Sequence, residues 1–445
     1  MRFTRRELFK NASAAGGALA ASAWLGRGAR AAELEAAPEN TPAAQDGERG
    51  MSSLPAAFDS LKPLGDRVKP ITVEEYKGRI EHARQLMTDA SPRFEALYIT
   101  PGTTLRYFAG FRWGLSERIV ALLIPRSGEP LVICPGFEER RLRENLRWPI
   151  EVRVWQEDES PYALAAKWLA ERGIRSGRVG VDETANFVFI DGLRKAAPSL
   201  EVTSGDEVIH GCRARKSEHE LELMRLACQA TFDVYKATFA SLREGMRQSE
   251  VSEWVARGYR KMELVGDAFV LFGPAAAFPH GTHEDRELHE GDCVLVDDGT
   301  TVDGYQSDVT RTMVFGKPSD KLQRAFEIVR GAQDAALAAA VAGHECGSVD
   351  DAARKVVVDA GFGPDYKYFG HRLGHGMGLD GHEWPYLVRG NKTILKSGMT
   401  FSDEPGIYVP GEYGMRCEDD MVIMESGAAH LLTPGFQPSL EVPIA

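Results

Sequence analysis

Acidic residues end or interrupt apolar, strand-like segments in the second half of the chain. Asp297 ends one such segment, and Asp308 follows eleven residues later, beyond a turn at Asp303-Gly304. A hairpin at that turn would bring both carboxylates together. Glu404 and Glu418 occupy similar positions further along the chain. An unpaired carboxylate is costly to bury, so any fold of this chain must neutralise these acids.

A histidine accompanies the four acids. His375 lies in Gly-His-Gly-Met-Gly, a segment with little side-chain bulk. Since the four carboxylates are anionic and an imidazole is neutral, two divalent cations would balance the set. Carboxylates with one imidazole suit Mn²⁺, Fe²⁺, Co²⁺ or Zn²⁺, and the excess of carboxylates makes Mn²⁺ the first choice. Two such ions about 3.5–4 Å apart can share a bridging hydroxide that acts as a nucleophile.

Strand periodicity predicts which neighbours share a face with these residues. Successive side chains of a strand point to opposite faces. Arg416 should therefore lie on the side of Glu418, while Cys417 points away. The same rule places three further neighbours: Ser402 toward Glu404, and Asp298 and Asp403 away from the site.

The motifs that contain these residues resemble the family of aminopeptidase P, prolidase and methionine aminopeptidase, whose fold is called the pita bread. In chain order they are Asp-x-Gly, Ser-Asp-x-Thr-Arg-Thr, Gly-His-Gly-x-Gly-Leu, Glu-Pro-Gly-Ile-Tyr and Arg-x-Glu-Asp, within about 215–445. Each motif alone is modest, but five in family order are specific. Residues 105–111 resemble the N-terminal domain of creatinase and prolidase. The resemblance implies an α+β pita-bread catalytic domain preceded by a smaller α/β creatinase-type domain.

The resemblance also implies how the metal ions are held. Asp297 and Asp308 would bind one ion side-on and bridge to the second, His375 and Glu404 would complete one ion, and Glu418 would bridge both. Creatinase shares the fold but lacks these ligands. All five are present here, which argues against its metal-free reaction.

The resemblance further implies substrate-side residues. His280, His371 and His382 occupy the positions of histidines that flank the scissile bond in the proline-specific branch and stabilise its developing oxyanion. Glu404 would pass a proton from the bridging water to the leaving amine. Arg416 either acts at the site or only neutralises surplus carboxylate charge. Tyr408 and Trp384 are interpreted as packing residues.

These expectations favour a metal-dependent exopeptidase that hydrolyses Xaa-Pro bonds in dipeptides or at the N-terminus of peptides. An alternative keeps the metals but acts on a small molecule as a hydrolase or lyase. A catalytically silent binding module is disfavoured, because idle buried carboxylates would be costly. The sequence does not separate prolidase from aminopeptidase P. The resemblance alone implies a homodimer.

Three parts follow the N-terminal residues. Residues 32–70 contain five prolines and are predicted to be a mostly irregular linker. Residues 71–210 are predicted to form the α/β domain, and 215–445 the catalytic domain. The α/β domain should contain strands at 96–99, 119–124, 131–134, 152–155 and 179–181, and helices at 162–171 and 187–196.

The catalytic domain should contain two pairs of helices, each followed by strands. Ser217 and Glu220 form a capping box that begins the first helix. Later helices are predicted at about 249–264, 319–341 and 348–360, with β-rich stretches at 292–315 and 393–425. This order suggests a weak internal duplication.

Residues 1–31 differ in charge from the rest of the chain. They include the pair Arg5-Arg6, a weakly apolar stretch from Ala12 to Leu25, and Ala29-Arg30-Ala31. This segment resembles a twin-arginine export signal, which implies a periplasmic or secreted protein. Its Ser and Gly residues dilute the apolar run, so stable membrane insertion is not expected.

The rest of the chain is acidic. The whole sequence has 53 basic and 65 acidic residues, a net charge of −12, which becomes −17 without residues 1–31. That balance argues against a nucleic-acid partner, because binding phosphates needs a basic face. The six cysteines show no Cys-x-x-Cys pair, so a cysteine metal site or disulfide scaffold is not indicated. Some of them could still pair after export.

Overall fold

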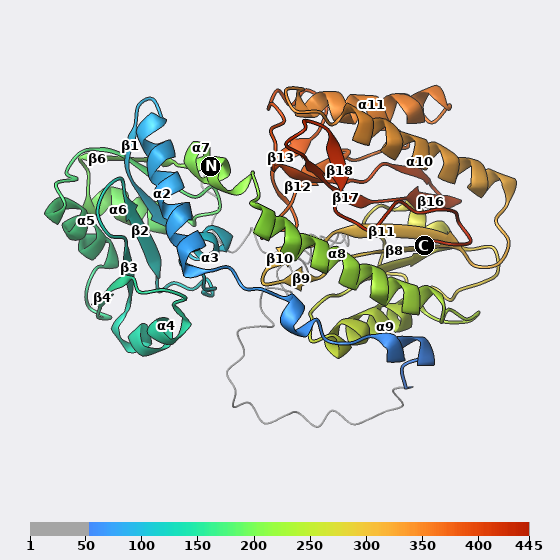
Figure 1. Cartoon of the computed structure of the whole chain (residues 1–445), viewed down its shortest axis with the longest axis horizontal. Helices are drawn as coiled ribbons and strands as arrows, with labels where there is room; N and C mark the ends of the chain where they lie inside the picture. The colour runs from blue at the N-terminus through green and yellow to red at the C-terminus, as the bar shows by residue number, and fades with distance from the viewer. Residues whose placement is uncertain (1–52, 445) are drawn as a thin grey trace, which may run out of the picture. The chain divides into compact units, whose positions relative to one another are not determined.

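The computed structural model describes residues 53–444. The predicted export signal lies outside these residues. The first part is a six-stranded mixed sheet in the order β4-β3-β2-β1-β5-β6 (Figure 1). Its strands are β1 (Phe94–Ile99), β2 (Ala121–Pro125), β3 (Leu131–Pro135), β4 (Glu151–Trp155), β5 (Gly177–Val181) and β6 (Leu200–Ser204).

Helices cover both faces of this sheet. They are α2 (Val73–Asp89), α3 (Thr103–Ala109), α4 (Glu139–Asn145), α5 (Pro161–Glu171), α6 (Phe187–Ala196) and α7 (Asp206–Arg213). Strand alternation divides the buried residues between two cores. Leu97 packs in the core that includes Ile80 of α2, whereas Tyr98 packs with Trp168 of α5 and Leu193 of α6. The five predicted strands and two predicted helices of this part are confirmed, whereas β6, α2, α3, α4 and α7 were not predicted.

The described part of the predicted linker is packed. Residues 53–70 contain two short 3₁₀ turns, Ala56–Ser60 and Gly65–Arg67, and are otherwise irregular. Phe58 is buried with its ring centre 6.2 Å from that of Trp254. Lys261 Nζ donates a hydrogen bond of 2.8 Å to the carbonyl oxygen of Phe58. This segment therefore lies against a helix of the catalytic domain.

The catalytic part has two helix pairs, and Figure 1 shows the second pair lying along strands of the larger sheet. The helices are α8 (Glu218–Phe239), α9 (Gln248–Lys261), α10 (Asp320–Ala339) and α11 (Cys346–Asp359). All four predicted helices are confirmed. No helix between residues 53 and 444 is both long and apolar enough to span a membrane.

The strands of this part form four antiparallel sheets. A three-stranded sheet has the order β11-β8-β7 and a five-stranded sheet the order β13-β12-β14-β17-β18, while β9-β10 and β15-β16 are hairpins. Their bounds are β7 (Phe269–Phe272), β8 (Cys293–Asp298), β9 (Thr301–Val302), β10 (Tyr305–Gln306), β11 (Val309–Val314), β12 (Gly374–Gly376), β13 (Glu383–Leu387), β14 (Thr400–Asp403), β15 (Gly406–Val409), β16 (Tyr413–Arg416), β17 (Asp419–Ile423) and β18 (Ala429–Leu431).

The predicted capping box at the start of α8 is present and has further partners. Ser217 Oγ accepts a hydrogen bond from the Glu220 amide, and Glu220 Oε2 accepts one from the Ser217 amide. The other carboxylate oxygen, Oε1, accepts from Arg79 of α2 at 2.9 Å and from the Tyr305 hydroxyl at 2.6 Å. One buried carboxylate thus joins α2, α8 and β10.

The predicted turn lies between β9 and β10. Asp303 and Gly304 have φ values of 44° and 87°, the left-handed conformation that a tight two-residue hairpin requires. Asp303 Oδ2 accepts a hydrogen bond of 3.0 Å from the amide of Ile71. The hairpin returns the chain so that Asp297 in β8 and Asp308 before β11 lie close together.

Candidate metal centre

The five predicted ligands come together from different strands. Asp297 belongs to β8 and His375 to β12, while the other three lie directly beside strands: Asp308 before β11, Glu404 after β14 and Glu418 between β16 and β17. Sheet register explains part of this. Thr310 of β11 pairs with Asp297 in β8, and Gly376 of β12 pairs with Phe401 in β14.

Their donor atoms form two groups that share one residue. Ligand atoms of Asp297, Asp308 and Glu418 lie within 4.8 Å of one another, and so do those of His375, Glu404 and Glu418. His375 Nε2 lies 3.5 Å from Glu404 Oε1 and 3.6 Å from Asp308 Oδ2. Glu418 thus belongs to both groups, and together they contain all five predicted ligands.

The pKa shifts in the cluster indicate that it can bind cations. Burial, followed by repulsion from Asp297, raises the pKa of Glu418 to about 8. Burial and Glu418 raise the pKa values of Asp308 and Glu404 well above their ordinary values. Burial, followed by His382, lowers the pKa of His375 to about 3, so its imidazole is neutral and free to coordinate. The donor set therefore fits divalent cations.

Arg416 is held inside this cluster. Its Nε donates to Thr310 Oγ1 at 3.0 Å, its Nη1 donates to the Tyr408 hydroxyl at 2.9 Å, and its Nη2 pairs with Asp297. Cys417 points away, toward Gln437. The alternation predicted for this strand is confirmed.

The other predicted faces are also observed. Ser402 Oγ lies 3.5 Å from Glu404 Oε1 and accepts a hydrogen bond from the His375 amide. Asp298 accepts a hydrogen bond from the amide of Asp267, away from the ligands. Asp403 is buried opposite Asp419 across β14 and β17.

The three predicted substrate-side histidines differ in their surroundings. Both ring nitrogens of His371 have a hydrogen-bond partner. Nδ1 lies 2.8 Å from the Arg372 carbonyl oxygen, and Nε2 lies 2.8 Å from the Tyr408 hydroxyl. His382 is exposed, and its ring stacks on that of His375 with centres 3.6 Å apart. His280 is exposed and follows Pro279, whose carbonyl accepts from Arg416.

Tyr408 has a role that its interpretation as a packing residue missed. A carbonyl only accepts hydrogen bonds, so Nδ1 of His371 carries the proton and Nε2 accepts from the Tyr408 hydroxyl. That hydroxyl in turn accepts from Arg416. The network fixes the tautomer of His371. The signal in the sequence is its place in Glu-Pro-Gly-Ile-Tyr, four residues after Glu404.

Two models of known protein families match the chain. The model for the creatinase/prolidase N-terminal domain matches residues 79–215, and that for metallopeptidase family M24 matches 222–425. A Mycobacterium tuberculosis protein named probable dipeptidase PepE is 36% identical over 360 residues, which cover 80% of this chain and 94% of the relative. The chain belongs to metallopeptidase family M24.

Further relatives of this M24 metallopeptidase carry related names. The Xaa-Pro dipeptidase of Lactobacillus delbrueckii subsp. lactis is 33% identical over 340 residues, 75% of this chain and 91% of that protein. The crystal structure of dipeptidase PepE from Mycobacterium ulcerans superposes with a TM-score of 0.76 at 34% identity, covering 82% of this chain and 98% of that one. The predicted fold, a pita-bread domain after a creatinase-type domain, is confirmed.

A buried ion network supports the His382 segment of this M24 metallopeptidase. Glu383 Oε1 pairs with Lys216 Nζ at 2.5 Å, and Oε2 pairs with Arg213 Nη2 at 2.6 Å. The same arginine nitrogen pairs with Asp380 Oδ2 at 2.6 Å. These cations lie in α7 and just before α8, so the segment that carries His382 is tied to the connection between the two domains.

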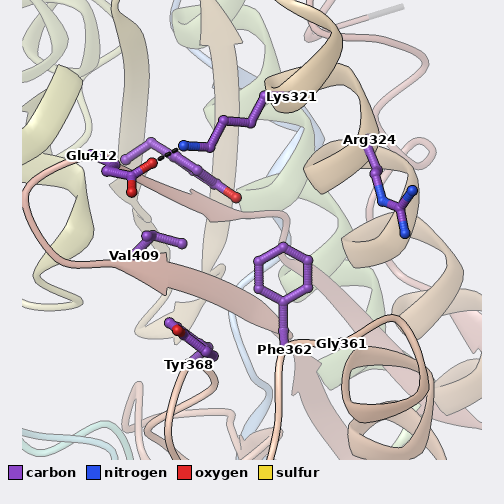
Figure 2. Close-up of a pocket in the computed structure, with 8 residues that line it drawn as sticks. Lys321, Arg324, Gly361, Phe362, Tyr368, Val409 and Glu412 are labelled. Atoms are coloured by element: carbon purple, nitrogen blue, oxygen red, sulfur yellow. Dashed lines mark ion pairs between the residues drawn. The ribbon is translucent and has the colours of Figure 1, made fainter.

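A separate surface groove lies beside the β15–β16 hairpin. It has a volume of about 210 Å³ and is lined by Phe362, Tyr368 and Val409, with Lys321 and Glu412 paired across one side (Figure 2). Tyr408 points to the ligand cluster and its neighbour Val409 to the groove. No predicted ligand lines this groove, so it is distinct from the metal centre of the M24 enzyme.

Proposed function

We propose that this M24 metallopeptidase hydrolyses the Xaa-Pro bond of dipeptides or of peptide N-termini with two divalent metal ions, Mn²⁺ as the first choice. The observation that carries the proposal is the pair of donor groups joined by Glu418, with His371 and His382 at its edge. The name of the Lactobacillus relative, an Xaa-Pro dipeptidase, supports the specificity.

In this proposal Asp297, Asp308, His375, Glu404 and Glu418 hold the ions. Bound divalent ions supply Lewis acidity to polarise the scissile carbonyl group. Arg416 balances the surplus negative charge of the cluster and orients Asp297 through their ion pair. Its other N–H groups hold Tyr408 and Thr310, so the ligands keep their positions as charge develops.

The chain supplies the proton transfer. Glu404 Oε2 lies 3.8 Å from His371 Nδ1, at the edge of the ligand cluster. In this proposal the Glu404 carboxylate takes up a proton and passes it to the leaving amine. His280 and His382 are exposed. In this proposal they donate hydrogen bonds to the developing oxyanion. His371 would first have to exchange one of its present hydrogen bonds.

Substitution of single ligands tests the centre. His375→Ala and Asp308→Ala should each lose bound metal and activity together, because each removes one donor from a shared cluster. Metal content by elemental analysis and turnover by peptide assay measure the two effects. His289→Ala, an exposed histidine outside the cluster, is the matched control and should change neither. A His375→Ala enzyme with full metal and full rate would refute the site.

A peptide panel tests the specificity. The purified enzyme with Mn²⁺ is assayed on Xaa-Pro dipeptides, on Xaa-Pro-Yaa peptides and on matched peptides with alanine in place of proline. We expect turnover of proline-containing substrates and little of the alanine set. No turnover on either proline set contradicts the peptidase proposal.

We also propose that the protein is exported by the twin-arginine pathway to the periplasm or the medium, and that it acts as a homodimer. The support for export is the Arg5-Arg6 pair with the apolar stretch and Ala29-Arg30-Ala31 that follow it. The chain also exceeds its relatives in length, since one alignment covers 91% of the Lactobacillus protein but 75% of this chain.

A further inference from the structure

A second group of metal-ligating side chains lies in the creatinase-type domain, apart from the five ligands described above. It consists of Glu183, Asp206 and His210, whose ligand atoms all lie within 4.8 Å of one another. The group offers two carboxylates and one imidazole. Borderline divalent cations such as Zn²⁺ accept this combination of oxygen and nitrogen donors.

The sheet and helix α7 bring these three residues together. β5 and β6 are neighbouring parallel strands, and their last residues, Val181 and Ser204, are register partners. Glu183 and Asp206 each follow two residues later, so both acids leave the sheet at the same edge. His210 lies four residues after Asp206 in α7, which places the two side chains on one helical face. The fold itself therefore assembles the group.

One carboxylate oxygen of the group is unsatisfied. Asp206 Oδ2 accepts a hydrogen bond of 2.5 Å from the Ser204 hydroxyl. Asp206 Oδ1 is buried and has no hydrogen-bond partner among residues 53–444. A buried acceptor without a partner costs free energy, and a bound ion would remove that cost. This oxygen indicates a ligand that the described part of the chain does not provide.

The spacing of Glu183 and His210 fits a shared ion better than a direct hydrogen bond. Glu183 Oε1 lies 3.4 Å from His210 Nε2. Hydrogen bonds between N–H and oxygen usually measure about 2.7–3.2 Å. Two ligand atoms bound tetrahedrally to one zinc ion, each at about 2.1 Å, lie about 3.4 Å apart. The Glu183 side chain is half-exposed, so an ion can reach the group from solvent.

The imidazole of the group is held in place by the catalytic domain. The His210 ring lies nearly parallel to that of Trp384, with centres 4.8 Å apart and an angle of 12° between the planes. Trp384 belongs to β13, the strand that begins directly after His382. Because the stack fixes the ring before an ion binds, less side-chain freedom is lost on binding.

We propose that Glu183, Asp206 and His210 bind an additional divalent cation, Zn²⁺ as the first choice, outside the catalytic centre. The ion joins the loop after β5 to α7 through three protein ligands, and water completes its coordination. Its role is structural. Since α7 also carries Arg213, the partner of Glu383, the ion steadies the helix that supports the His382 segment.

The metal content of the full chain tests this site. Wild-type and substituted enzymes are dialysed against Mn²⁺ and then against increasing concentrations of Zn²⁺, and the total metal per chain is measured by elemental analysis. His210→Phe keeps an aromatic ring on Trp384 but removes the nitrogen donors, and Glu183→Ala removes an exposed ligand. Each variant should hold one metal ion fewer per chain than the wild type.

The matched control is Glu207→Ala. Glu207 is an exposed acid next to Asp206 in α7, but it lies outside the group and pairs with Arg178. This variant should hold as much metal as the wild type. Equal metal content in the wild type and in either His210→Phe or Glu183→Ala would overturn the inference. The comparison does not depend on how many ions the catalytic centre holds, so a failure of that centre would appear separately, in His375→Ala.

Discussion

The Tyr408 hydroxyl links two residues that the sequence placed at the site for separate reasons. It accepts from Arg416 at 2.9 Å and donates to His371 at 2.8 Å. Burial raises the pKa of Tyr408 to about 12, so the hydroxyl stays protonated and keeps its donor at neutral pH. This one proton fixes how the His371 ring faces Glu404.

Removing this hydroxyl should lower activity without removing metal. Tyr408→Phe keeps the ring but breaks both hydrogen bonds, and we expect kcat/KM to fall by about 10- to 100-fold, as for other partners that orient catalytic groups. Peptide kinetics and metal analysis measure the two effects. Tyr413→Phe changes the other tyrosine of the hairpin, whose ring lies beside Lys321 in the groove, and should have wild-type kinetics. Equal effects of both substitutions would contradict the assignment.

For single residues, the sequence predicted the face to which a side chain points better than the residues that it contacts. Strand alternation correctly placed Arg416 on the side of Glu418 and Cys417 on the other side. This prediction needs only the rule that successive side chains of a strand point to opposite faces. It did not predict that Arg416 would use its donors on Thr310 and Tyr408, since those contacts join strands far apart in the chain.

Two helices begin with the same capping motif in different surroundings. In α2 the Thr72 and Glu75 side chains form an exposed capping box, and in α8 Ser217 and Glu220 form one whose glutamate is buried. Glu220 also pairs with Arg79 at 2.9 Å. Glu75 also pairs with His219 of α8 at 2.8 Å, but both of these side chains are partly exposed, whereas Glu220 neutralises a buried arginine.

The two glutamates should therefore differ in their contribution to stability. Glu75→Ala should lower the free energy of unfolding by about 1 kcal/mol, the usual effect of losing a cap. Glu220→Ala should lower it by about 3–5 kcal/mol, because it leaves Arg79 buried without its partner. Urea unfolding at fixed metal concentration measures both. Similar losses for the two variants would show that burial of the Arg79–Glu220 pair adds nothing to the free energy of unfolding.

Elements with a clear pattern were predictable, and others were not. The helix at 187–196 was predicted with its observed bounds because apolar residues recur on one face. α2 was missed because its 17 residues are largely charged and polar. β6 was missed because its five residues alternate too briefly to exceed chance. For α2 the usable signal was local, the capping pair Thr72 and Glu75.

The charge of the whole molecule separates into parts with different meanings. Residues 1–31 carry six basic residues and one acid, and without them the chain has a charge of −17. Two bound divalent ions would reduce this to −13 by neutralising the four ligand carboxylates. The remainder lies on other residues and gives no information about the substrate.

Export should depend on the arginine pair rather than on positive charge as such. Changing Arg5 and Arg6 to Lys keeps the charge but removes the pair, and the precursor should accumulate in the cytoplasm. Cell fractionation and immunoblotting measure this. Arg27→Lys with Arg30→Lys, two basic residues outside the pair, should be exported normally. Unchanged export of the first variant would contradict the assignment.

The ion pairs of Glu383 have a consequence for how the domains can be recombined. A cut at residue 215, the predicted start of the catalytic domain, would leave Lys216 with Glu383 but remove Arg213. The acid beside His382 would lose half of its compensation, although every predicted metal ligand would remain. The ion pairs that support the catalytic domain thus extend into α7, before the predicted start of that domain. Exchange of N-terminal domains among relatives must carry α7 along with the catalytic part to keep the His382 segment in place.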